Sequence, residues 1–386
     1  MNEIIDLREY VYTLNKLPDL YESLRMVDED FILLSNDIEP LEPTKNIIIV
    51  KDIPRYFDIK NKSLSKGIKH LCTEQYSGFS INFKNVTSTD DYLKSRFGSS
   101  SRYKLRRSIK KLEKCFDINY KMYFGEMSKQ DYDFIFEEFF RLLEIRSIEK
   151  GILNNRNLKR KSYYHELVYN LILQKKASFY VIYNGYNPID ICLNFHLNDI
   201  VYQLIRTYDI NYSKFNTGYV DLIKQIDWCI ENHVSFINFS YGDFYWKRRW
   251  CNSVYKYDSH IFYNSKSIKS IASAYLYNAK IKIKHILREN KIIDKYHEIK
   301  LKIHHFLNTK KEFEIEVIDI DFNRAEPLDC KIDFYKNDYN FLRRYIYEFL
   351  FNFNEEEKDI KVYKLLKPLK SFLVIGKKNK IIINVK

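Results

Sequence analysis

Hydrophobic and polar residues alternate most clearly in the middle of the chain. Over Ile189–Leu197 every second residue is apolar, and the residues between them are Asp190, Cys192, Asn194 and His196. Because the side chains of a strand point alternately to its two faces, this pattern predicts a strand with one apolar and one polar face. Strand-like runs at about 179–184 and 200–208 flank it, separated by short turns. We expect the three strands to form consecutive antiparallel pairs.

A helical period replaces this alternation after residue 216. The segment 217–232 opens with Asn216-Thr217-Gly218, and its apolar residues recur at helical spacing. The residues expected to face the sheet are Tyr219, Val220, Ile223, Ile226 and Ile230. A short strand and a Gly-Asp turn follow, so the local order is β-β-β-loop-α-β.

Further elements are predicted on both sides of this segment. Short strands are expected at 31–34, 47–50, 79–83 and 118–123, a basic helix after Ser99–Ser101, and helices at about 128–145 and 162–174. A strand at 312–321, a helix at about 337–353 and a hairpin at 371–385 are expected near the C-terminus.

A long basic helix is predicted over 267–307. Its apolar stripe, expected to be buried, consists of Ile271, Tyr275, Ala279, Ile283 and Ile286. A row of Lys280, Lys284 and Arg288 is expected to be exposed and to bind anionic membrane surfaces weakly.

Charge is distributed unevenly along the chain. Residues 1–44 carry 11 acidic and 3 basic residues, although the whole chain has a net charge of +13. A basic body favours polyanionic partners such as phosphorylated cofactors, anionic lipids or nucleic acid. A merely solvated basic surface is the alternative.

The sequence also excludes several kinds of site. The nine glycines are too widely spaced for GxGxxG or GxxxxGK[ST], which excludes the standard dinucleotide and P-loop sites. No HExxH motif or zinc-like spacing occurs, so no metal is expected. The six cysteines form no CxxC pair, as is typical of a reduced cytosolic protein. No signal peptide and no run of the ~20 apolar residues that span a membrane is evident.

Four segments between Phe79 and Trp250 carry a family resemblance. They are RYKLRRSIKKLEK, FFRLLEIRSIEKG, TYDINYSKFNTGYVDLIKQIDWCIENH and NFSYGDFYWKRRW, in that order. In this order they resemble the CelD-type acyltransferases of the GNAT superfamily, relatives of the FemAB-type aminoacyl transferases. The resemblance implies an acyl-CoA co-substrate, no metal and no covalent enzyme intermediate.

The chain departs from the family pattern at three places. Asn238 stands where the family usually has Asp, and Trp246 stands where Tyr is usual. Only Gly218 remains of the pyrophosphate loop that is common in other acetyltransferases. CoA binding is therefore implied by the family and not by this loop.

Candidate cofactor-binding residues lie at Asn216, Thr217 and Gly218 and in the basic turn at Lys247 and Arg248. A helix N-terminus presents unpaired N–H groups and partial positive charge, which predicts a phosphate cradle. Ordinary capping by Asn216 or Thr217 is the alternative. Lys247 is also a candidate catalytic residue that stabilises the oxyanion of the tetrahedral intermediate. As an exposed residue, it is expected to contribute little to stability.

The polar strand face is expected to open into the same cleft as Lys247 and the 216–218 turn. His196 or Asp190 is the candidate general base there, and a satisfied half-buried histidine is the alternative for His196. Asp209, at the end of the next strand, is either a base, an orienting acid or a turn cap. The candidate substrate-binding residues are Arg146, Asn194, Tyr245 and Trp250. Arg146 would bind an acidic acceptor or pair with a core carboxylate, and the aromatic residues would stack on a ligand or simply pack.

The predicted fold class is α/β, with tandem GNAT-like mixed sheets, flanking helices and a C-terminal helical and α+β extension. The expected domains are 1–115, an N-terminal half with its basic linking helix; 116–265, the second acyltransferase domain; and 266–386, the long basic helix with a small α+β tail.

The predicted function is transfer of an acyl group from an acyl thioester, with acyl-CoA as co-substrate, to an amine or hydroxyl of a sugar, lipid or cell-envelope polysaccharide precursor. One alternative is an aminoacyl transferase that uses charged tRNA, whose phosphates suit the basic helices. Another is a non-enzymatic basic adaptor on anionic membrane or nucleic acid, and an inactive relative of the family also stays open. The expected location is cytoplasmic, with peripheral contact to the inner membrane face as a further possibility.

Overall fold

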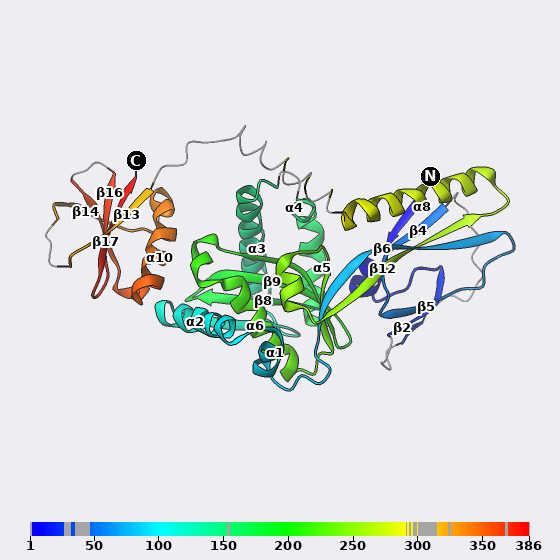
Figure 1. The fold of residues 1–386 in the computed structure, drawn as a ribbon, viewed down its shortest axis with the longest axis horizontal. Coiled ribbons are helices and arrows are strands. Elements are labelled where there is room, and N and C mark those ends of the chain that lie inside the picture. Colours follow the sequence, from blue (N-terminus) through cyan, green and yellow to red (C-terminus); the bar gives the residue numbers. More distant parts are fainter. Residues whose placement is uncertain are drawn as a thin grey trace.

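The computed structural model describes residues 2–26, 32–34, 47–152, 155–290, 292, 295, 299, 315–322, 326–366 and 370–385. Within these residues the largest sheet has nine strands (Figure 1). Their order is β1 (Glu3–Asp6), β4 (Ile47–Pro54), β12 (Ser253–Asn264), β6 (Ile68–Asn82), β11 (Phe236–Tyr241), β10 (Ile200–Tyr208), β9 (Asn187–Leu197), β8 (Ala177–Asn184) and β7 (Ile118–Tyr123). The pairs β1–β4 and β10–β11 are parallel, and the other neighbours are antiparallel.

The central strands confirm the predicted alternation. β8, β9 and β10 form consecutive antiparallel pairs, and α6 (Thr217–Glu231) follows them. On α6, Val220, Ile223 and Ile226 are buried, and Tyr219 and Ile230 pack against the core that contains Ile223 and Ile226. The apolar face of β9 carries Ile191 and Leu193 into a second core on the other side of the sheet.

The strands β6 and β12 connect the N-terminal residues to this central part. They pair antiparallel from Ile68 to Ser80, with β4 on the far edge of β12 and β11 on the far edge of β6. The two expected GNAT-like halves therefore share one continuous sheet. A separate sheet of the N-terminal part contains β3 (Ile32–Leu34), β2 (Tyr21–Met26) and β5 (Phe57–Asn61).

Helices cover both faces of the nine-stranded sheet (Figure 1). α3 (Lys129–Glu149) and α5 (Lys161–Leu173) lie on one face, and α6, α1 (Thr89–Arg96) and α2 (Ser99–Cys115) lie on the other. The shorter helices are η1 (Glu9–Leu14, a π-helix), α4 (Arg156–Lys159), η2 (Ile210–Phe215) and α7 (Tyr245–Trp250).

The helix α8 (Ile268–Glu289) packs on β4, β6 and β12 with a different face from the predicted one. Ala274 and Ile281 are buried against the sheet, whereas Ile283 and Ile286 are more than half exposed. Arg288, expected to be exposed, lies with its guanidinium 4.7 Å from the ring centroid of Tyr76. Ile271 packs against the same core as predicted, but the rest of the predicted stripe was wrong, because the small and β-branched residues at 274 and 281 fit the sheet more closely. The predicted helix beyond Asn290 lies largely outside the described residues.

The C-terminal residues form an α+β unit. Its sheet has the order β13 (Ile315–Ile320), β17 (Lys380–Val385), β16 (Ser371–Ile375), β15 (Lys361–Leu365) and β14 (Leu328–Ile332). η3 (Asn337–Leu342), α10 (Arg343–Phe353) and η4 (Glu357–Asp359) complete it. α10 joins a core that also contains Leu112 and Phe116 at the end of α2. Among the described helices, none is long and apolar enough to cross a membrane.

Candidate active site

The parallel strands β10 and β11 separate in the middle of the sheet. They pair only at Ile200–Tyr202 with Phe236–Asn238, and no described strand pairs with this edge of β10 beyond that point. β10 has a bulge after Gln203, and Ser240 of β11 has a φ of 60°. A bulge bends a strand and leaves backbone groups outside the ladder. The two strands therefore present open edges towards each other.

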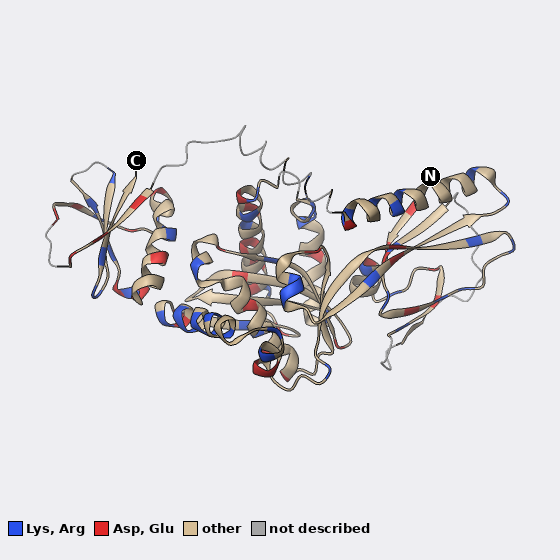
Figure 2. Ribbon diagram, viewed as in Figure 1, with Lys and Arg blue, Asp and Glu red and all other residues tan. Residues whose placement is uncertain are grey.

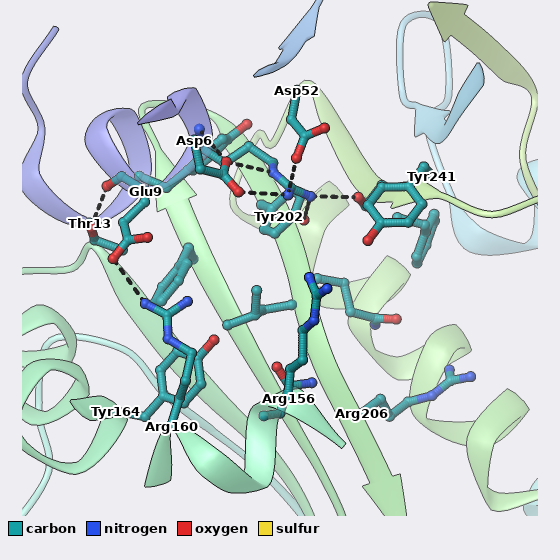
Figure 3. A pocket seen from close by; sticks show the side chains of 18 of the residues that line it. Asp6, Glu9, Thr13, Asp52, Arg156, Arg160, Tyr164, Tyr202, Arg206 and Tyr241 are labelled. Carbon is teal, nitrogen blue, oxygen red and sulfur yellow. Dashed lines mark hydrogen bonds and ion pairs between the residues drawn. The ribbon is translucent and has the colours of Figure 1, made fainter. Parts of the chain in front are cut away.

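A pocket of about 530 Å³ lies where the strands separate (Figure 3). Its walls come from β10, β11, the start of α7, the N-terminal segment around β1 and η1, and the residues from α4 to the start of α5. Its basic side chains are Arg8, Lys51, Arg156, Arg160, Arg206 and Lys247, and its acidic side chains are Asp6, Glu9 and Asp52. The N-terminal segment, to which the sequence assigned no chemistry, thus supplies one wall.

Arg8 fixes this wall to the ends of the two strands. Its guanidinium donates to Asp6 and to the buried Asp52, and also to the hydroxyls of Tyr202 (3.1 Å) and Ser240 (3.2 Å). Burial opposes ionisation of Asp6, but Arg8 and Lys51 outweigh it and lower the pKa of Asp6 below its usual value. Charge-assisted bonds of this kind are short and directional, so the wall is held rigidly.

Tyrosine hydroxyls connect the pocket to Asn238. The Tyr12 and Tyr56 hydroxyls lie 3.1 Å apart, and the amide of Asn238 donates to Tyr56 (2.7 Å). The amide oxygen of Asn238 accepts a hydrogen bond from Tyr255 (2.6 Å). Burial raises the pKa of Tyr56 and Tyr255 well above the usual value, so both hydroxyls are neutral. An ionised Asp at 238 could only accept, which explains why Asn suits this network.

Lys247 lies in the pocket, but it is buried and not exposed as expected. Its side chain is 4 % exposed, and Nζ donates to the backbone oxygens of Phe239 (2.7 Å) and Tyr241 (2.5 Å). These oxygens belong to the end of β11, which still pairs with β6 there but no longer pairs with β10. Burial lowers the pKa of Lys247 to about 8. Lys247 therefore supplies the hydrogen-bond donor that a neighbouring strand would otherwise supply to these oxygens.

His196 and Asn194 lie on the other side of the sheet, under α6, and not in the pocket. The His196 ring packs between Phe124 and Trp228, and its Nε2 lies 2.8 Å from the hydroxyl of Ser178. Asn194 donates to Gln225 of α6 (3.0 Å). Burial lowers the pKa of His196 to about 3. The expectation that this polar face opens into the cleft was wrong, because α6 supplies polar partners and covers it.

A buried acidic cluster lies between α6 and β10. Asp221 accepts from Gln225 (2.9 Å) and lies 3.5 Å from Arg206, and Asp190 has no hydrogen-bond partner among the described residues. Burial raises the pKa of Asp190 well above its usual value, and it raises that of Asp221 to about 6 in spite of Arg206. Arg206 thus links the pocket to the underside of α6.

The turn Asn216–Gly218 borders a different hollow from Lys247. Asn216 lines a space of about 220 Å³ together with Lys104, Arg249 and Trp250. Arg206 separates this hollow from the main pocket, since its guanidinium donates to the Gly218 oxygen (2.8 Å) and lies over the ring of Trp246. The expectation of one shared cleft was therefore wrong. Thr217 is buried at the start of α6, and Trp250 packs against Phe97.

The remaining predicted residues lie outside the main pocket. Arg146 donates to the hydroxyl of Tyr208 (2.6 Å) and pairs with Glu149. Asp209 accepts from the backbone and side chain of Asn211, so it caps a turn. Tyr245 is 76 % exposed, and Arg248 pairs with Asp243 beside a second pocket.

Sequence reasoning missed Arg8, Arg156, Arg160, Tyr202 and Arg206. One signal was present: Arg206 is the one charged residue of the strand β10, and a charge within a strand pattern is often functional. Arg8 gave no such signal, because its partners are brought in from distant parts of the chain.

The family comparison agrees with the sequence motifs. Residues 99–248 match the family described as "Acetyltransferase (GNAT) domain", which spans α2 to α7 and includes β10, α6 and β11. The part of the chain from α2 to α7 is thus similar to a GNAT acetyltransferase domain. No curated protein matches the chain.

Solved structures show weak similarity. A conserved protein of unknown function from Bacteroides thetaiotaomicron VPI-5482 is 9% identical, covers 66% of this chain and 91% of its own, and gives a TM-score of 0.38. FemX is 11% identical over 55% of this chain and 71% of its own, with a TM-score of 0.38. L-PGS from Bacillus licheniformis is 11% identical over 61% and 73%, with a TM-score of 0.35. Such low scores decide neither the donor nor the acceptor.

Proposed function

We propose that this protein transfers an acyl group from an acyl thioester, with acyl-CoA as donor, to an amine or hydroxyl of a sugar, lipid or cell-envelope precursor. The observation that carries the proposal is the separation of β10 and β11 around the pocket. The pantetheine arm of CoA is an extended chain with two amides. Open strand edges bind such chains through main-chain hydrogen bonds.

The donor's phosphates are assigned to the hollow beside Asn216. Lys104 and Arg249 supply positive charge there, and Ser101 accepts a hydrogen bond from Arg249 (2.8 Å). The first turn of α6 adds unpaired N–H groups and a partial positive charge. A donor bound in this way would pass beside Arg206 to bring its thioester into the main pocket.

The reaction itself needs a nucleophile, a proton acceptor and an oxyanion partner. The acceptor's amine or hydroxyl attacks the thioester carbon, the C–S bond breaks, and the thiolate leaves and takes up a proton. Glu9, with a side chain about 40 % exposed, is the most accessible carboxylate of the pocket and is proposed as the base. The Tyr202 hydroxyl, which accepts from Arg8, is proposed to donate to the oxyanion.

The test is a binding and turnover assay with the full chain. Native mass spectrometry with CoA and acyl-CoA should show one bound donor, and thiol release should depend on an added acceptor. Leu204 lines the pocket at the bulge, and Leu204→Trp should abolish donor binding by filling the space between the strands. If Leu204→Trp binds acyl-CoA as wild type does, the donor lies elsewhere.

A peripheral membrane contact is proposed as a property of α8. Its exposed side carries Tyr275, Leu276, Ile283 and Ile286, and Lys280, Lys282 and Lys284 flank them. An apolar stripe with basic flanks is typical of helices that lie on anionic membranes (Figure 2 marks the Lys and Arg positions of the ribbon in blue). Each base near the surface adds about 1 kcal/mol.

Vesicle flotation tests this contact. The chain should float with vesicles that contain anionic lipid and not with neutral vesicles, and Ile283→Ser with Ile286→Ser should remove flotation. Phe134→Ser, an exposed apolar residue of α3, is the matched control. Equal flotation of both variants would place the contact elsewhere.

A further inference from the structure

A row of arginines in the main pocket has no role in the chemistry described above. Arg160, Arg156 and Arg206 follow one another along one side of the pocket (Figure 3). The acidic side chains Asp6, Glu9 and Asp52 lie along the opposite side (Figure 3). The pocket therefore has a basic side and an acidic side.

The basic side holds more charge than its neighbours neutralise. Six basic side chains line the pocket against three acidic ones. Arg8 forms ion pairs with Asp6 and Asp52, and Arg160 forms an ion pair with Glu9 at 2.9 Å. Arg156 is exposed and has no hydrogen bond or ion pair with any described residue. It is the side chain best placed to bind a ligand without first breaking a bond.

A second element adds positive charge near Arg156. The pKa of Lys284 on α8 is lowered by burial and by the charges of Arg288, Lys280 and Arg156. Like charges that are held together repel, and a bound anion relieves that repulsion. The surroundings of Arg156 thus favour an anion of more than one charge.

On the basis of the acyl transfer proposed above, we infer that the acceptor carries a phosphate group and that Arg156, with Arg160 beside it, binds that group. A guanidinium binds phosphate through two parallel hydrogen bonds, which orients the ligand as well as attracting it. A phosphate monoester balances the surplus charge better than a single carboxylate does. The acceptor's nucleophile would then lie towards Glu9 and the open edge of β10.

The position of Arg156 separates this site from the donor's phosphates. α4 packs with α3 and α5, on the face of the sheet opposite α6. The hollow beside Asn216 lies on the α6 side of Arg206. Donor and acceptor phosphates would therefore enter from opposite faces of the sheet and bind at the same time.

Calorimetric titration of the full chain with inorganic phosphate tests the inference, first without CoA and then with saturating CoA. Wild type should bind phosphate in both conditions. Arg156→Gln should weaken phosphate binding about 10-fold or more, the scale of losing a charged hydrogen-bond pair, and leave CoA affinity within about twofold. Arg156→Lys keeps the positive charge but loses the paired N–H donors of the guanidinium. Its phosphate affinity should therefore lie between those of wild type and Arg156→Gln. Lys159→Gln, an exposed change on the same helix, should match wild type.

The outcomes separate the two proposals. Displacement of phosphate by CoA would overturn the inference, because the arginines would then hold the donor. No phosphate binding by wild type, or equal losses in Arg156→Gln and Lys159→Gln, would also overturn it. If phosphate follows the expected pattern but no acyl-CoA binds, the phosphate site is supported and the proposed donor is wrong.

Discussion

At the scale of single residues, burial decides what a charged side chain does. Lys247 was expected to be exposed, and His196 was expected to be either a general base in the cleft or a satisfied half-buried histidine, but both side chains are buried outside such a role. Lys247 completes the hydrogen bonds of a strand end, and His196 bonds to Ser178 under a helix. Residue type and spacing indicated where a strand ends, but they contain no information on which distant element covers it.

Replacing Lys247 with Ala should destabilise the protein. The backbone oxygens of Phe239 and Tyr241 would lose their donor, at a cost of about 1–3 kcal/mol for buried unsatisfied groups. Arg248→Ala, which removes only an exposed ion pair, should change the free energy of unfolding by less than about 0.5 kcal/mol. Urea denaturation of both variants measures the difference, and equal midpoints would show that Lys247 has no structural role.

His196 should make the fold sensitive to acid. Because burial lowers its folded pKa to about 3, the unfolded chain binds a proton near pH 6.5 that the folded chain does not. Stability from this residue is therefore complete above pH 6.5 and falls as pH drops towards 3, by about 1.4 kcal/mol at pH 5.5. His196→Gln should reduce the loss between pH 7.5 and 5.5 in urea denaturation. If His196→Gln loses as much stability as wild type between pH 7.5 and 5.5, His196 is not the group that takes up the proton on unfolding.

Glu9 should affect rate rather than donor binding. If Glu9 takes the proton from the acceptor, Glu9→Gln should lower kcat by about 10²-fold and leave acyl-CoA affinity unchanged. Glu166→Gln, on an exposed position of α5, is the control. A kcat within about twofold of wild type would assign the proton transfer to another group.

At the scale of elements, the strands and helices were more predictable than their faces. The alternation in β8, β9 and β10 and the helical period of α6 gave correct elements, because local periodicity sets them. The separation of β10 from β11 was not predictable, since both keep a strand pattern while their pairing stops. On α8, an apolar stripe was visible in the sequence, yet the sheet selects another face.

The link between β10 and α6 should depend on Arg206. Arg206→Met would leave the buried Asp221 without its cation, and breaking a buried pair in this way costs about 3–5 kcal/mol. The double variant Arg206→Met with Asp221→Leu removes both charges and should recover most of that loss. Thermal denaturation of the single and double variants checks this, and a double variant less stable than Arg206→Met would contradict it.

At the scale of the whole molecule, one core joins residues 99–248 to the C-terminal unit. Tyr347 of α10 lies with its ring 4.9 Å from Phe116 and 4.7 Å from Tyr212. Lys111 of α2 donates to the backbone oxygen of Phe351, and its ammonium lies over the ring of that residue. This contact could not be predicted from the sequence, since its residues come from segments more than 100 positions apart.

Tyr347→Ala should therefore destabilise the C-terminal unit and the part of residues 99–248 that packs against it. Removing a buried aromatic side chain from a shared core costs about 3–5 kcal/mol. We expect hydrogen exchange to lose protection in α10 and also at the C-terminal end of α2 and in η2, because these segments pack on the same ring. Phe341→Ala, a 40 % exposed aromatic residue of the same unit, should change exchange only locally. If Tyr347→Ala reduces protection in α10 alone, the C-terminal unit unfolds independently of residues 99–248. The core between them then contributes little to the stability of residues 99–248.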